Sequence, residues 1–320
     1  MGTYLISRAV STLVLLYLIV TVVFLLLHAL PGDPAMAVLG GIDANPTEED
    51  IARVRAELGL DRPLYVQYID WLGGIVRLDL GESFVNNRSV SEDLFTRLPR
   101  TMMIIVPAVI LAIVIGVPMG ILAARYRRTM VDPLISATAL IGFSVPVFVT
   151  GLLLVLVFSI ELGWLPANGY VDPRDDFTGF LKRAILPIVT LTLAPLAITM
   201  RMTRSSMLEQ LGLDYVRTAR AKGLTEFATL YGHALRNALL PVVTVVALQF
   251  GAMFAGSVLV EFVFNWPGVN SYLLTAISQR DYPVVQAVVL VIAAIFVLIN
   301  FLTDISYALF DPRIRLGNQR

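Results

Sequence analysis

The sequence predicts an all-α integral membrane protein with six transmembrane helices, and this prediction follows from composition and from the length of the apolar segments. Of the 320 residues, 57% are hydrophobic and only 15% are charged, whereas a typical soluble domain has about 25% charged residues. The mean hydropathy is +0.77. A helix of about 20 consecutive apolar residues crosses the hydrocarbon core of a bilayer, and several stretches of this chain reach that length.

Six stretches are long and apolar enough to be interpreted as spans. They lie at residues 9–30, 102–124, 134–160, 184–200, 239–264 and 284–310. The fourth stretch is the shortest and contains Pro187 and Pro195, which predicts a kink or an extension past Arg201. The first stretch is similar to a signal peptide because Arg8 precedes an apolar run. Its length and the five further stretches favour a membrane span instead.

Lys and Arg residues in the loops predict the orientation, because cytoplasmic loops carry an excess of them. One side contains Arg8, Arg125, Arg127, Arg128, Arg201, Arg204, Arg217, Arg220, Lys222, Arg236, Arg313, Arg315 and Arg320. The short loops of the opposite side contain only Arg174, Lys182, Arg183 and Arg280. We therefore expect a multi-pass protein with both termini and the loop at residues 205–238 in the cytoplasm.

The long loop after the first span is predicted to form a helical extracytoplasmic region. Thr47 can cap a helix with an acidic first turn, and Gly59 ends it. A second helix after Pro63 aligns one apolar face, made of Leu64, Tyr68, Trp71 and Leu72. Two interpretations remain open. The loop either covers the pathway and receives an external partner, or its amphipathic helices only cover the bundle.

The loop at residues 205–238 has the pattern of a helix, a turn and a second helix on the membrane surface. A helix over residues 214–222 is expected to end in a left-handed turn at Gly223. Thr225 can cap a second helix that directs four apolar residues toward the bilayer, namely Phe227, Leu230, Tyr231 and Leu235. The loop either inserts into a socket on a cytoplasmic partner or binds anionic lipid as a basic surface helix.

Ten residues of this loop are the candidate partner contacts. They are Asp214, Tyr215, Arg217, Thr218, Ala219, Arg220, Ala221, Lys222, Gly223 and Leu224. The small side chains among them, at residues 218, 219, 221 and 223, would let a partner approach closely. The three basic residues offer charge-assisted contacts at the rim.

Polar residues inside the predicted spans are candidates for lining a pathway, because they are costly to place in lipid. Gln249 lies in the middle of the fifth stretch, and Ser144 and Glu261 are the further candidates. Glu261 either meets an external partner or a substrate amine, or is an interfacial charge.

Other intramembrane residues have structural interpretations. His28 is expected to be a satisfied hydrogen-bonding residue rather than a ligand. Asp304 is expected to pair with a nearby cation such as Arg313. Gly116 and Gly120 form a pair of small residues four apart, which is typical of close helix packing.

The chain resembles a known family at the loop described above. Residues 217–223 read Arg-Thr-Ala-Arg-Ala-Lys-Gly, which is similar to the Glu-Ala-Ala motif of ABC importer permeases in its dipeptide/oligopeptide permease form. Arg217-Thr218-Ala219 replaces Glu-Ala-Ala, and the Leu-Pro pair comes late, at residues 240–241. Further matches are Leu30-Pro31-Gly32-Asp33-Pro34, Glu57-Leu58-Gly59-Leu60-Asp61, Asp79-Leu80-Gly81, Phe264-Asn265-Trp266-Pro267-Gly268 and Arg280-Asp281-Tyr282-Pro283-Val284-Val285-Gln286.

The resemblance implies a type I ABC importer permease fold in a bacterial or archaeal cytoplasmic (inner) membrane. The chain would form half of a pathway for di- and oligopeptides. Its expected partners are a second homologous permease subunit, two cytoplasmic ATP-binding subunits, an extracytoplasmic substrate-binding protein and membrane lipid. The candidate positions for docking of the binding protein are Asp79, Glu82, Trp266, Arg280 and Asp281.

The resemblance divides the chain into four parts. These are an N-terminal segment with the first span (1–30), an extracytoplasmic loop (31–100), a five-helix core with the coupling loop 205–238 (101–310), and a cytoplasmic tail (311–320). Glutathione, a nickel complex or an oligosaccharide is the alternative cargo.

Several other functions are disfavoured by the sequence. No Gly-x4-Gly-Lys-Ser/Thr phosphate-binding loop occurs, so we expect a non-enzymatic subunit without a cofactor, with ATP and Mg on partner subunits. Cysteine is absent, which excludes disulfides and thiolate metal sites. An ion-coupled secondary transporter would show ionisable relays and inverted repeats, and an intramembrane enzyme would show a catalytic set. The chain shows neither plainly, and no nucleic acid is expected as a partner.

Overall fold

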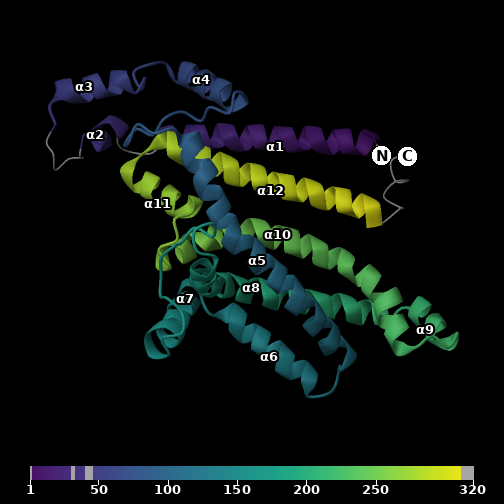
Figure 1. Cartoon of the computed structure of the whole chain (residues 1–320). Helices are drawn as coiled ribbons and strands as arrows, with labels where there is room; N and C mark the ends of the chain where they lie inside the picture. The colour runs from purple at the N-terminus through teal and green to yellow at the C-terminus, as the bar shows by residue number, and fades with distance from the viewer. Residues whose placement is uncertain (1, 30–32, 40–45, 311–320) are drawn as a thin grey trace. The chain divides into compact units, whose positions relative to one another are not determined.

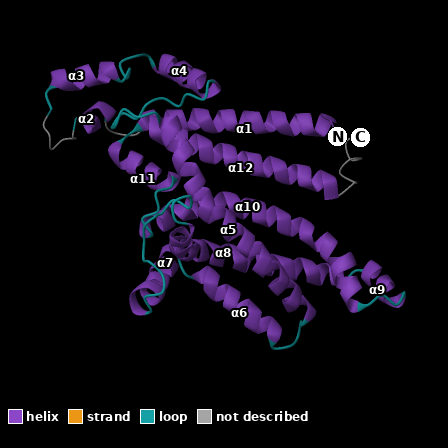
Figure 2. Cartoon of the chain, in the orientation of Figure 1, coloured by secondary structure: helices purple, strands orange, loops and turns teal. Residues whose placement is uncertain are grey.

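The computed structural model describes residues 2–29, 33–39 and 46–310, and helices dominate these residues (Figures 1 and 2). The α-helices are α1 (Gly2–Ala29), α2 (Pro34–Val38), α3 (Glu48–Glu57), α4 (Leu64–Val76), α5 (Val90–Arg125), α6 (Val131–Ser144), α7 (Val147–Val155), α8 (Phe177–Leu211), α9 (Asp214–Ala221), α10 (Leu235–Val263), α11 (Val269–Gln279) and α12 (Tyr282–Phe310). Two π-helical segments are also present. η2 (Leu156–Glu161) continues α7, and η3 (Ala228–Ala234) leads into α10. The all-α prediction is confirmed for these residues.

Five helices in the described part of the chain are long and apolar enough to cross a membrane. They are Ser7–Ala29, Val90–Arg125, Phe177–Leu211, Ala228–Val263 and Tyr282–Thr303. These helices correspond to the first, second, fourth, fifth and sixth predicted spans. The fourth continues past Arg201 as expected, with Pro187 and Pro195 inside one unbroken helix.

The third predicted span, residues 134–160, is not one helix, so the prediction of six spans is confirmed for five helices and not for this one. Helix α6 ends at Ser144, and Val145 is extended, with φ −88° and ψ 128°. The ring of Pro146 disfavours helical geometry in the residue before it, and it suits the start of the next helix. Helix α7 and the turn η2 then form a shorter apolar segment, Val147–Glu161.

Two compact units make up the chain. The first contains residues 1–5, 102–266 and 298–320, and the second contains residues 6–101 and 267–297. In the first unit, α8 packs against α6, α7 and α10. A Cβ atom added to Gly120 would lie 2.6 Å from the Met200 carbonyl oxygen and from the Thr203 Cβ atom. A Cβ atom on Gly116 would lie 3.1 Å from the Leu196 oxygen, so the expected close helix packing is confirmed.

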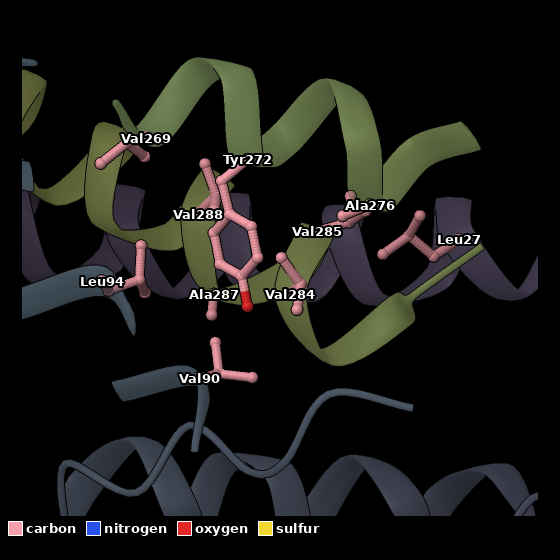
Figure 3. Close-up of a cluster of buried hydrophobic side chains, with 10 residues drawn as sticks. All are labelled: Leu27, Val90, Leu94, Val269, Tyr272, Ala276, Val284, Val285, Ala287 and Val288. Carbon is pink, nitrogen blue, oxygen red and sulfur yellow. The ribbon is translucent and has the colours of Figure 1, made fainter. Parts of the chain in front are cut away.

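The second unit has its own apolar core, where α11 packs on the first turns of α12 (Figure 3). Its buried members are Leu27, Val90, Leu94, Val269, Tyr272, Ala276, Val284, Val285, Ala287 and Val288. The Arg97 guanidinium lies 4.6 Å from the centre of the Tyr272 ring. Burial raises the pKa of the Tyr272 phenol, and the negative charge of Asp93 adds to this effect, so the phenol stays protonated.

Helices α3 and α4, in the loop after the first span, form where predicted, but Leu64 of the expected apolar face of α4 is 53% exposed. The Thr47 hydroxyl accepts a hydrogen bond from the Asp50 amide at 3.2 Å and caps α3. Gly59 follows α3 with φ +67°, and its amide donates to the Ala56 carbonyl at 3.1 Å. Ile51 on α3 is buried in a small apolar cluster with residues of α2. The outer region is therefore a packed structure rather than a linker.

Candidate functional site

The turn that ends α9 has the predicted left-handed geometry. Gly223 has φ +83°, a value that glycine adopts without a steric penalty. The Gly223 amide donates to the Arg220 carbonyl at 2.9 Å, and the Leu224 amide donates to the Ala219 carbonyl at 3.3 Å. This pair of bonds is the usual end of an α-helix at a glycine. The turn sends the chain back toward α10.

Helix α9 buries one face and exposes the other. Val216 and Ala219 are buried, as expected for residues three apart on one helix face. The other candidate contacts on α9 and in the turn after it are exposed. They are Asp214, Tyr215, Arg217, Thr218, Arg220, Ala221, Lys222, Gly223 and Leu224. The prediction that Ala219 offers a small surface to a partner is wrong, because this side chain packs inside its own chain. The small residues at positions 218, 221 and 223 stay accessible.

The segment after the turn begins as predicted and then differs. The Thr225 hydroxyl accepts a hydrogen bond from the Ala228 amide at 3.3 Å. The second helix is not a separate surface helix, because η3 runs directly into α10. Phe227 and Tyr231 are exposed and their rings contact each other at 4.5 Å. Leu230 is buried in a cluster with Met207, so the prediction that it faces the bilayer is wrong.

Side-chain bonds tie α9 to the two helices that flank it. The Tyr215 hydroxyl donates to Gln210 Oε1 on α8 at 2.8 Å, and it accepts from Asn237 Nδ2 on α10 at 3.3 Å. The Arg220 guanidinium donates to both carboxylate oxygens of Glu226, at 3.2 and 2.8 Å. This bidentate pair closes the turn around Gly223. Tyr215 of α9 is therefore bonded to both α8 and α10.

The pathway candidates occupy different environments. Gln249 Nε2 donates to Thr199 Oγ1 at 3.4 Å, and Gln249 Oε1 is buried without a hydrogen-bond partner in the described residues. The side chain adjoins Pro195 on α8 and apolar residues of α5, so it points into the helix bundle. Ser144 is exposed at the end of α6, and Glu261 is fully buried on α10.

The docking candidates separate into exposed and buried residues. Asp79, Glu82 and Arg280 are exposed, whereas Trp266 and Asp281 retain 1% and 3% of their accessible surface. The prediction that the latter two contact a binding protein is wrong for this structure, because their side chains are buried within the chain.

The two buried docking candidates have structural roles. The Asp281 carboxylate accepts hydrogen bonds from the Ser83 hydroxyl at 2.5 Å and from the Phe84 amide at 3.1 Å. The Trp266 ring lies 5.1 Å from the Tyr170 ring and 6.0 Å from the Phe180 ring. A sequence signal existed for Asp281, because an Asp two residues before a Pro is typical of a helix start.

His28 is satisfied, as expected. Its Nδ1 atom lies 2.8 Å from the Phe24 carbonyl oxygen, and its Nε2 atom lies 3.2 Å from Gln67 Oε1. The expected pair of Asp304 with Arg313 lies outside the described residues, which end at residue 310.

Comparison with known families gives two matches that together cover most of the chain. Residues 116–316 match the model described as "Binding-protein-dependent transport system inner membrane component". Residues 1–105 match the model described as "Binding-prot-dependent transport system membrane comp, N-term". The matched segments contain every candidate site described above.

Several curated relatives are similar over nearly their full length. The "Probable peptide ABC transporter permease protein y4tP" of Sinorhizobium fredii is 43% identical over 315 residues, covering 98% of this chain and 100% of the relative. The "Dipeptide transport system permease protein DppB" of Escherichia coli (strain K12) is 41% identical, covering 91% and 92%. The "Glutathione transport system permease protein GsiC" of Escherichia coli O6:H1 is 41% identical, covering 98% and 99%.

Proposed function

Because this chain belongs to the family of binding-protein-dependent transport system inner membrane components, we propose that it forms half of the translocation pathway of an ATP-driven importer of di- and oligopeptides. It is a membrane permease subunit, and members of this family are transport components rather than catalysts. The full-length similarity to relatives named as peptide and dipeptide permeases carries the proposal.

The α9 loop is the contact for a cytoplasmic ATP-binding subunit. Its exposed rim combines small residues, such as Thr218 and Ala221, with the cations Arg217 and Lys222. Small residues allow close approach of a partner, and cations form charge-assisted hydrogen bonds with acidic groups. The chain has no phosphate-binding loop of its own, so ATP and Mg are handled by two such partner subunits.

The mechanism is a shift between outward- and inward-facing arrangements. ATP closes the pair of ATP-binding subunits, and α9 transmits this movement to α8 and α10 through the hydrogen bonds of Tyr215, while the Arg220–Glu226 pair holds the turn after α9. Moving an equilibrium from 1:99 to 99:1 requires about 5.5 kcal/mol of differential binding, which is within reach of nucleotide-driven closure.

The chain lies in a bacterial or archaeal cytoplasmic membrane with both termini and α9 in the cytoplasm. The excess of Lys and Arg in the loops on that side supports this orientation. A second permease subunit completes the pathway, and an extracytoplasmic binding protein delivers the cargo. Asp79, Glu82 and Arg280 are the exposed candidates for that contact.

Glutathione is the second candidate cargo, because a relative named as a glutathione permease is also 41% identical over nearly its whole length. Mass spectrometry of the ligand that co-purifies with the binding protein distinguishes the two. A mixture of short peptides supports the proposal, and glutathione alone would replace it with the second candidate.

The coupling contact is testable with single cysteines, because the natural chain contains none. Ala221→Cys places a thiol on the exposed rim of α9, and Ala52→Cys places one on the exposed side of α3 as a control. In the complete importer we expect Ala221→Cys to crosslink to the ATP-binding subunit and Ala52→Cys not to. Labelling of the α9 thiol by a membrane-impermeant reagent added outside intact cells would overturn the assignment.

A further inference from the structure

Helix α4 packs one face against the outer part of α1. The Tyr68 ring lies 5.2 Å and the Trp71 ring 5.7 Å from the Phe24 ring on α1. A hydrogen bond of 2.6 Å joins the hydroxyls of Tyr68 and Thr21, and Gln67 contacts His28. The contacts run along α1 from residue 28 back to residue 21, and Figure 1 shows α4 beside this part of α1.

These contacts relate α4 to the candidate span Ser7–Ala29 of α1. The first span ends at Ala29, and Thr21 lies about 12 Å before that end, at a rise of about 1.5 Å per residue. A helix that contacts Thr21 must therefore lie beside the span and not beyond it. A soluble protein outside the membrane cannot reach this depth.

A neighbouring side of α4 is apolar and largely exposed. Its outer stripe consists of Tyr65, Ile69, Leu72 and Val76. The spacing of four, three and four residues places these side chains on one face of the helix. Tyr65, Ile69 and Val76 expose 68%, 62% and 84% of their accessible surface. Single exposed apolar residues are common, but a stripe at helical spacing needs a partner.

The side of α1 that faces away from its neighbours is apolar at the same depth. Val22, Leu25 and Leu26 each expose more than half of their surface, and they belong to a helix that is long and apolar enough to cross the bilayer. Lipid is the partner expected for such residues in a span. The outer stripe of α4 lies at this level and has the same chemistry.

We propose that α4 lies in the outer leaflet of the membrane, with its outer stripe on the acyl chains at the boundary with the headgroups. Amphipathic helices that rest at this boundary sink about 5–10 Å into it. Thr21 lies slightly deeper, about 12 Å from the end of the span, and the Tyr68 side chain extends from α4 to reach it. The partner of the outer stripe is therefore lipid and not an external protein.

The charged residues around α4 fit this position. Asp70 lies outside the stripe and pairs with Arg62 at 2.7 Å, so the pair carries no net charge. Arg77 follows the helix directly and is exposed. A long Arg side chain can extend toward the headgroup phosphates while its stem stays on apolar surface.

Spin labels on single cysteines test the proposal, and the cysteine-free chain needs no prior substitution. The variants Tyr65→Cys and Ile69→Cys place a label on the outer stripe. Leu25→Cys on α1 is the control for lipid, and Ala52→Cys on α3 is the control for water. Each variant is assembled into the complete importer in lipid nanodiscs. The accessibility of the label to oxygen and to a nickel chelate is then measured.

We expect the stripe labels to show a ratio of oxygen to nickel accessibility severalfold above that of Ala52→Cys and close to that of Leu25→Cys. Oxygen enriches in acyl chains, whereas a polar chelate stays in water. A ratio equal to that of Ala52→Cys would overturn the proposal. Immobile labels that neither reagent reaches would also overturn it, because the stripe would then be covered by a protein subunit.

Discussion

Helices α3 and α9 use the same local design in two regions of the molecule. Each is short and amphipathic, and each ends at a glycine with positive φ, +67° at Gly59 and +83° at Gly223. Each buries two apolar residues three apart, Ile51 with Val54 in α3 and Val216 with Ala219 in α9. The backbone geometry alone therefore does not distinguish the two roles that we propose for these helices.

The difference lies in what each helix is bonded to. The Arg55 side chain of α3 forms an ion pair with Asp33, which caps the neighbouring helix α2, so its bonds stay within the outer region. The Tyr215 hydroxyl of α9 joins α8 to α10, and both are long enough to cross the membrane. We therefore expect changes in α9 to affect transport and changes in α3 to affect local stability only.

The largest effect is expected from Gly223→Val. A β-branched residue is an outlier at positive φ, and sparsely populated backbone geometry costs about 1–3 kcal/mol, so the turn opens and α9 loses its direction. We expect the variant to insert normally but to lose substrate-stimulated ATP hydrolysis and uptake, measured in proteoliposomes with the complete importer.

Gly59→Val is the matched control, because it introduces the same strain after α3. Its uptake should stay near that of the unaltered protein. Gly223→Asn should keep part of the activity, because Asn tolerates left-handed geometry. An equal loss of uptake in both valine variants would show that the two helices do not differ in the way proposed here.

The next largest effect is expected from Asp281→Ala in the outer region. The Ser83 hydroxyl and the Phe84 amide would lose a charged acceptor, and hydrogen bonds to charged groups contribute about 1.5–3 kcal/mol each. We expect faster hydrogen exchange at residues 83–90, measured by mass spectrometry, with ATP-driven coupling retained. The exposed Asp61→Ala should leave exchange unchanged. Lost coupling in Asp281→Ala would assign the outer region a part in transmission.

A smaller effect is expected where α8, which carries α9, packs against α5. Gly120→Ala places a Cβ atom 2.6 Å from the Met200 oxygen and from the Thr203 Cβ atom, and overpacking costs about 1–3 kcal/mol. The midpoint of thermal unfolding should fall by a few degrees. Gly256→Ala on α10 meets nothing within 4 Å and should leave the midpoint unchanged. An unchanged midpoint in both variants would contradict the close packing of α5 on α8.

The smallest effect is expected from Glu226→Gln, which removes the charge that holds Arg220 across the turn. Both side chains are about half exposed, and such pairs contribute about 0.2–1 kcal/mol. We expect a modest fall in ATP-driven uptake that high salt reproduces in the unaltered protein by screening. Glu209→Gln, an exposed carboxylate on α8, is the control. A larger loss in Glu209→Gln than in Glu226→Gln would argue against the bridge.

Local features of the fold were predictable because the residues that cause them are local. Thr47 and Thr225 cap helices through their own hydroxyls, and Gly223 has the positive φ that its place in the sequence indicates. Gly116 and Gly120 were predictable as a packing surface, because small residues four apart let helix backbones approach. The pattern does not predict which helix contacts these two glycines, and in the structure it is α8.

The sequence does not predict which polar and aromatic side chains become buried by contacts with distant parts of the chain. Trp266 and Asp281 lie in polar or aromatic strings that favour a surface role, and their partners Tyr170 and Ser83 are distant in the chain. The break at Val145 was missed for another reason. The apolar length of residues 134–160 favours one span, but Pro146 disfavours helical geometry at Val145, and this local effect breaks the helix.

The pair of Arg204 with Asp132 has a mechanical consequence. Two parallel bonds of 2.6 and 2.7 Å join the guanidinium on α8 to a carboxylate in the first turn of α6, and this fork geometry resists rotation as well as separation. The two helices are clamped at that point and must travel as one rigid piece. If α9 is displaced by a partner as proposed, we expect α6 to move together with α8 rather than α8 alone.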